Sequence, residues 1–94
     1  NGNIKKRRPR RKRMSLHLMN DDINSFDYVI STLCRLLPMC NTLQAEQIAM
    51  LVHTSGECHI YTGYAPDIYS TYAQLQKSGL TIKIKIHDKN ENSN

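Results

Sequence analysis

Three consecutive polar residues, Asn20, Asp21 and Asp22, lie between apolar residues in the stretch LMNDDINSFDYV at residues 18–29. An amide beside two carboxylates can bind a cation, act as a general acid or base, or cap the first turn of a helix. The remaining residues of the chain decide between these chemistries.

The sequence matches no metal-binding or catalytic motif. A calcium-binding EF-hand loop needs Gly at its sixth position and Glu at its twelfth, but a loop that starts at Asp22 would place Asp27 and Leu33 there. Cys58 and His59 are neighbours that point to opposite faces of a strand, so they do not chelate zinc easily. No nucleophile elbow, phosphate-binding loop or spaced carboxylate pair is present. We expect no enzymatic activity, no cofactor and no metal. One alternative stays open, a nucleophilic Cys/His pair whose residues are distant in the sequence and meet only in the folded chain.

The polar cluster lies between a short strand and an amphipathic helix. Leu16 and Leu18 alternate with polar neighbours, which predicts a half-buried strand directly before the cluster. A helix follows, which Asn24 or Ser25 can cap and which Pro38 ends. Its apolar residues recur at helical spacing and are Phe26, Val29, Ile30, Leu33, Leu36 and Leu37.

The later segments complete a β-α-α-β-α-β order. They are a helix from residue 41 or 42 to 55, a strand at 58–61, a helix at 66–78 and a strand at 81–86. Strands and helices that are apolar on one side predict an α+β fold, in which three helices cover one side of a three-stranded antiparallel sheet.

Positive charge is concentrated at the start of the chain. Eight of the thirteen Lys and Arg residues lie at residues 5–13, so the net charge of +5 hides a mildly acidic body. Like charges repel, which predicts a flexible basic extension at residues 1–14, one folded domain at 15–87 and a frayed polar tail at 88–94.

The cysteines and the hydropathy indicate a cytoplasmic setting. Cys34, Cys40 and Cys58 form no CxxC pair and leave an odd thiol under any disulfide scheme. No apolar run approaches the roughly 20 residues that span a bilayer. We expect a reduced, cytoplasmic monomer without a membrane partner.

An antiparallel pairing of the first two helices would bring residues 20–22 close to His53, in the last turn of the second helix. The polar groups would then form the mouth of an apolar gap, a site suited to a ligand with a cationic head and an apolar arm. The floor of the gap would be Phe26, Val29, Ala49 and Val52. A purely structural alternative is that the two carboxylates are a cap and a solvated charge, and that His53 is a cation favoured by the helix dipole.

These residues resemble the ClpS family, the adaptors of the Clp ATP-dependent protease. The family pattern is Asn-Asp-Asp after a short strand, an aliphatic and aromatic helix, and a later helix that closes on Val-His-x-x-Gly. Here the two motifs are NDD at residues 20–22 and VHTSG at 52–56, within AEQIAMLVHTSGE. The resemblance covers about residues 15–86, and the two motifs together are more specific than either one.

The resemblance implies a role in the bacterial N-end rule. ClpS-like proteins bind the free α-amino group and the bulky first residue (Leu, Phe, Tyr or Trp) of proteins marked for degradation, and deliver them to a Clp AAA+ unfoldase. Amine binding is implied for Asn20, Asp21 and His53, with Asp22 as a supporting negative charge. The implied pocket walls are Phe26, Val29, Ala49, Val52 and Leu80.

Several positions depart from the family pattern. Residues 24–25 are Asn-Ser where Thr-Pro is usual, and Ala49 stands where many members carry a Met that limits the pocket. The smaller side chain predicts relaxed selection that admits Ile or Val. The segment at 57–79, where relatives dock the unfoldase, matches poorly, so no docking residue is assigned.

A second hypothesis is a small RNA- or ribosome-associated protein that acts through its basic tail. Such binding would weaken steeply with salt. The acidic body argues against a folded RNA-binding face, so nucleic acid is the less favoured partner.

Overall fold

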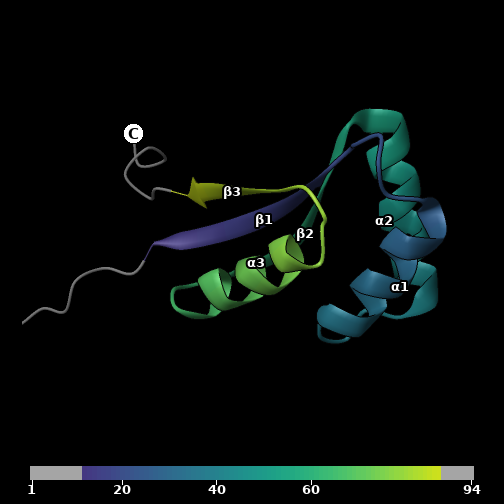
Figure 1. Ribbon diagram of the computed structural model, residues 1–94. Coiled ribbons are helices and arrows are strands. Elements are labelled where there is room, and N and C mark those ends of the chain that lie inside the picture. Colours follow the sequence, from purple (N-terminus) through teal and green to yellow (C-terminus); the bar gives the residue numbers. More distant parts are fainter. Residues whose placement is uncertain (1–11, 88–94) are drawn as a thin grey trace, which may run out of the picture.

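The secondary structure follows the predicted order. The computed structural model describes residues 12–87, and Figure 1 shows two helices between the first two strands and one between the last two. The predicted α+β fold is confirmed. The elements are β1 Arg13–Met19, α1 Phe26–Leu36, α2 Thr42–Ser55, β2 Glu57–Gly63, α3 Asp67–Lys77 and β3 Ile82–His87.

The first strand begins earlier than the sequence predicts. The predicted basic extension included Arg13 and Met14, yet both lie in β1. Met14 is 5 % exposed because its side chain packs in the core, an apolar contribution that the neighbouring charges hide in the sequence. Residues 1–11 of the predicted extension, to which the RNA hypothesis refers, and the predicted polar tail at 88–94 lie outside the described residues.

The central strand of the sheet is β1. The strand order is β2-β1-β3, and both pairings are antiparallel. Leu16 pairs with Tyr61, but a bulge then shifts the register so that His17 pairs with His59. Because side chains alternate along a strand, the even-numbered residues of β1 face the core and the odd-numbered residues face the opposite side.

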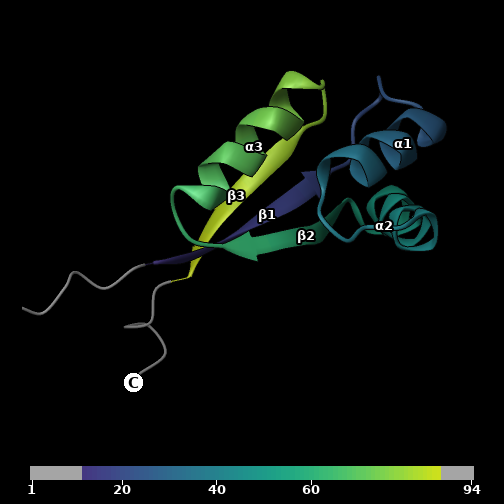
Figure 2. The ribbon, with the colours of Figure 1, turned by 90° about the horizontal axis from the view of Figure 1, so that it is seen from below.

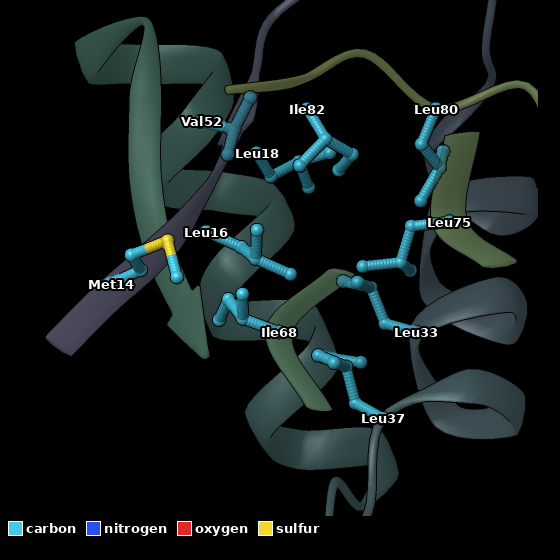
Figure 3. Packing of buried hydrophobic residues seen from close by; sticks show 11 residues of the cluster. Met14, Leu16, Leu18, Leu33, Leu37, Val52, Ile68, Leu75, Leu80 and Ile82 are labelled. Atoms are coloured by element: carbon cyan, nitrogen blue, oxygen red, sulfur yellow. The ribbon is translucent and has the colours of Figure 1, made fainter. Parts of the chain in front are cut away.

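The α3 helix lies on the core side of the sheet, and the α1–α2 hairpin packs at the end of the sheet. Figures 1 and 2 show α3 alongside the strands, and the α1–α2 hairpin beside the end where β1 ends and β2 begins. Figure 3 shows side chains from β1, β3 and the three helices meeting in one cluster, which includes Leu16, Leu33, Val52, Ile68 and Leu75. Burial of one such Leu or Ile side chain contributes about 1.5–3 kcal/mol to folding. No helix within residues 12–87 is long and apolar enough to cross a membrane.

Polar caps fix the ends of the two helices that frame the candidate site. Of the two predicted caps for α1, Ser25 is the one used, and its Oγ accepts a hydrogen bond from a backbone N–H of the first turn. Asn41 and Gln44 form a reciprocal capping box at the start of α2. Gly56 ends α2 with a φ of 92°, a left-handed conformation that glycine adopts without steric cost.

Candidate functional site

A cleft of about 90 Å³ opens where β1 ends, α1 begins and α2 ends. Its polar lining consists of Asn20, Asp21, Asn24 and His53. Its apolar lining consists of Leu18, Met19, Phe26, Val29, Ala49, Val52 and Leu80. One concave surface therefore combines an acidic, hydrogen-bonding edge with an apolar wall, the combination typical of ligand sites.

The cleft brings together three of the four residues predicted to bind an amine: Asn20, Asp21 and His53. Asp22 is not part of its lining and is exposed to solvent. All of the predicted wall residues line the cleft, and they are Phe26, Val29, Ala49, Val52 and Leu80.

Asp21 is held by four hydrogen bonds. Its Oδ1 accepts from the backbone N–H groups of Ile23 and Asn24, both at 2.9 Å. Its Oδ2 accepts from Asn24 Nδ2 at 2.8 Å and from Thr81 Oγ1 at 3.2 Å. A carboxylate has about four lone-pair sites, so these bonds occupy them and fix its orientation. What Asp21 offers to a ligand is therefore mainly its negative charge.

The same contacts keep Asp21 ionised. Burial raises the pKa of the Asp21 carboxyl, but the hydrogen bonds from Asn24, Ile23 and Thr81 outweigh burial and lower the pKa below its usual value. The group is a carboxylate at neutral pH, and its charge favours a cation in the neighbouring cleft.

Asn20 and His53 have hydrogen-bonding groups available for a ligand. The backbone N–H of Asn20 donates to the Gly56 carbonyl at 2.9 Å, which joins the end of β1 to the end of α2. No group within residues 12–87 hydrogen-bonds to the side chain of Asn20 or to the His53 ring. The His53 ring instead contacts the Phe26 ring edge to face. An amide oxygen and an imidazole nitrogen can each accept a hydrogen bond at the edge of the cleft.

The connection between α3 and β3 holds the polar turn in place. Asn24 Nδ2 also donates to the Gly79 carbonyl at 3.0 Å, and the Met19 N–H donates to the Thr81 carbonyl at 2.9 Å. Leu80 lies between these two anchored residues and is 2 % exposed. These contacts explain how Leu80, which is far along the chain from residues 20–24, comes to line the cleft.

Three cleft residues were missed by sequence reasoning: Leu18, Met19 and Asn24. The first two immediately precede the polar cluster, and their position at the end of a strand was the available signal. Asn24 has the residue type of a helix cap, so its contact with the distant Gly79 carbonyl has no local sequence signal.

A larger hollow, of about 420 Å³, lies between the α1–α2 connection, α2 and β2. Apart from Gln44 and Gln47, its lining is apolar or a thiol, with no charged group. The smaller cleft is the better candidate because polar and apolar groups converge there. Within the described part of the chain, no three His, Cys, Asp or Glu side chains are arranged to hold a metal ion.

Comparison with known protein families identifies the family to which this chain belongs. The family described as "ATP-dependent Clp protease adaptor protein ClpS" matches residues 9–89. The chain belongs to the ClpS family. The resemblance predicted from the NDD and VHTSG motifs is confirmed. ClpS is an adaptor of the Clp protease and not the protease itself.

Similarity to individual ClpS proteins supports this assignment. The Clp protease adapter protein ClpS of Thermosynechococcus vestitus is 28 % identical over 65 residues, which cover 69 % of each protein. The structure of Agrobacterium tumefaciens ClpS2 bound to L-phenylalaninamide matches with a TM-score of 0.67 and 19 % identity. The match covers 83 % of this chain and 100 % of the other, and shows that the two share the ClpS fold.

Proposed function

We propose that this ClpS-family chain binds the N-terminus of substrate proteins and delivers them to a Clp-family AAA+ unfoldase for degradation. The recognised feature is a free α-ammonium group on a bulky hydrophobic first residue: Leu, Phe, Tyr or Trp. The observation that carries the proposal is that the ionised Asp21 and the available acceptors of Asn20 and His53 share one cleft with apolar walls. The L-phenylalaninamide bound to the related ClpS2 has the same two features, an amine and an apolar ring, and supports the proposal.

The polar residues divide the recognition of the ammonium group between them. The side-chain oxygen of Asn20 and a ring nitrogen of His53 accept its hydrogen bonds, because no group among residues 12–87 occupies them. Asp21 contributes its charge from a fixed position. Asp22 is exposed and outside the lining, so solvent and salt screen its contribution.

Recognition requires both parts of the ligand. Burial of a Leu- or Phe-sized side chain contributes about 1.5–3 kcal/mol, and each charge-assisted hydrogen bond about the same. A micromolar complex needs about 8 kcal/mol after the costs of ordering. An internal or acetylated Leu supplies the apolar part alone and leaves the acidic edge without its cation.

Calorimetry with a Leu-start peptide and its N-acetylated twin tests recognition of the amine. Loss of two charge-assisted hydrogen bonds predicts that the acetylated peptide binds at least about a hundredfold more weakly. Equal affinity for the two peptides would exclude the proposal.

Asp21→Asn and Asp22→Asn form a matched pair of variants, since each removes one negative charge. We expect the first to weaken binding of the Leu-start peptide by about tenfold or more and the second by less than about threefold. Similar losses in both would show that only the overall charge matters. Circular dichroism of each variant checks that the fold is retained.

Delivery is tested separately, with a Leu-start fluorescent protein and a purified Clp unfoldase–protease. The chain should accelerate degradation of this protein, and His53→Ala should remove the acceleration. Peptide binding without any acceleration would contradict delivery but leave recognition intact.

A further inference from the structure

The sheet face opposite the core carries three of the chain's four histidines. His17 lies on β1, His59 on β2 and His87 on β3. The α3 helix packs against the other face, and Figures 1 and 2 show no described helix over this one.

Side-chain contacts join the three rings into one cluster. Ser15 Oγ lies 3.2 Å from His17 Nε2 and 2.9 Å from His87 Nε2, and Ser15 is 1 % exposed. The rings of His17 and His59 meet edge to face with centroids 5.4 Å apart. The cluster therefore extends over all three strands.

Cationic residues surround the cluster. The β1–β3 register sets Arg13 opposite His87 and His17 opposite Lys83. Like charges directly opposite each other in a sheet are destabilising, so protonation of either histidine creates an unfavourable pair. A bound anionic group would offset this repulsion.

The one carboxylate in the described strands is Glu57. Its Oε2 lies 3.3 Å from Lys85 Nζ and its Oε1 lies 3.9 Å from His17 Nδ1. Arg13, Lys83 and Lys85 against Glu57 leave this face a net charge of +2 before any histidine is protonated. The face is thus cationic, whereas the cleft has an acidic edge.

We infer that this histidine face, defined by Arg13, His17, His59, Lys83, Lys85 and His87, binds an acidic segment of a partner protein more tightly as pH falls. Charge complementarity identifies the partner as anionic. Residues 5–12, which directly precede Arg13 in the sequence, contain seven further Lys and Arg. The face is separate from the cleft, so this inference does not rest on the proposed function.

The composition of the face favours protein over RNA. Single-stranded nucleic acids are bound on platforms of Phe, Tyr or Trp that stack on the bases. Tyr61 is the one such residue in the described strands, and its hydroxyl donates to Asp67 at the start of α3, on the covered side. The open face thus offers charge without a stacking platform.

The pH dependence follows from the charges around His17. Burial and the cation of Lys85 lower its pKa, Glu57 raises it, and His59 and His87 lower it further. His17 is therefore largely neutral at pH 7. Arg13 and Lys83 also face this cluster from β1 and β3. An acidic partner would compensate the surrounding cations and favour proton uptake, so binding and protonation strengthen each other.

Fluorescence anisotropy with the full chain tests the inference. The probe is an acetylated, amidated peptide of about ten residues that alternates Glu and Ser, with a Gln-for-Glu peptide and a single-stranded RNA of equal length as comparisons. We expect the affinity for the Glu peptide to rise at least about threefold from about pH 7.5 to about pH 6, where histidines gain charge. Lys, Arg and Glu keep their charge in this range, so the basic residues 5–12 cannot produce the rise.

Substitutions of the face residues supply the variants. His17→Gln combined with His59→Gln and His87→Gln should remove the rise, with circular dichroism to check that the fold is retained. Lys83→Gln should weaken binding by about threefold at both pH values. Lys77→Gln removes the same charge from the last turn of α3 and should leave binding unchanged. The inference is overturned if affinity does not rise, if the rise persists in the triple histidine variant, or if the affinity for the RNA rises more steeply with falling pH than that for the Glu peptide.

Discussion

The rings of Phe26 and His53 meet edge to face in the cleft, with centroids 5.9 Å apart and an angle of 82° between their planes. Phe26 opens α1 and His53 lies in the last turn of α2. An aromatic pair of this geometry contributes about 0.5–1.5 kcal/mol beyond its buried area. The contact places the apolar wall directly beside a hydrogen-bonding group, so one small ligand can reach both.

Phe26→Ala should weaken binding of a Leu-start peptide by about five- to tenfold, measured by calorimetry. The variant removes a partly exposed wall and its ring contact with His53, a loss of about 1 kcal/mol. Tyr69→Ala is the control, because Tyr69 is an exposed aromatic residue on α3 that does not line the cleft. Unchanged affinity in the Phe26 variant would remove Phe26 from the binding wall.

Asp21→Ala should lower the free energy of unfolding at pH 7 by about 1–2 kcal/mol, because it removes an acceptor of four hydrogen bonds. The pKa of Asp21 is lowered in the fold, so its stabilisation is fully present above the unfolded pKa of about 3.9 and declines as pH falls through the folded value. Urea unfolding should therefore show a smaller difference between variant and parent near about pH 3. A difference that does not depend on pH would contradict the assigned role of the carboxylate.

Ala49→Met should restore selection against β-branched first residues. Ala49 is 5 % exposed and lines the cleft, so a longer side chain takes space from the ligand. Overpacking costs about 1–3 kcal/mol, and we expect binding of an Ile-start peptide to weaken about tenfold more than that of a Leu-start peptide. Gln47→Met places the same side chain on the exposed face of α2 and is the control. If the parent already binds the Ile peptide about a hundredfold more weakly, Ala49 does not relax selection.

Thr32→Val should stabilise the fold by about 1 kcal/mol in urea unfolding. Thr32 is 0 % exposed, and its hydroxyl has no hydrogen-bond partner among the described residues. Valine has the same shape without the unsatisfied hydroxyl. Leu33→Ala, at the next buried position, should instead lower the free energy of unfolding by about 2–5 kcal/mol. A Thr32→Val variant that is less stable than the parent would indicate a polar partner for this hydroxyl.

Periodicity and capping patterns predicted the helices and strands well, because both patterns involve residues that are close together in the sequence. The alternation around Leu16 and the helical spacing from Phe26 located β1 and α1, except that β1 begins earlier, at Arg13. The choice between Asn24 and Ser25 as the cap was open in the sequence, because both side chains suit the position. The structure decided it, since Asn24 is engaged with Asp21 and Gly79.

The sequence by itself determined the α+β order and, through the NDD and VHTSG motifs, the ClpS family. Tertiary structure alone decided that four hydrogen bonds fix Asp21 and that Asp22 stays outside the cleft. It also decided that three histidines from separate strands share one face. The physical reason is distance along the chain. The bond from Asn24 to Gly79 spans 55 residues, so no local pattern of residue types encodes it.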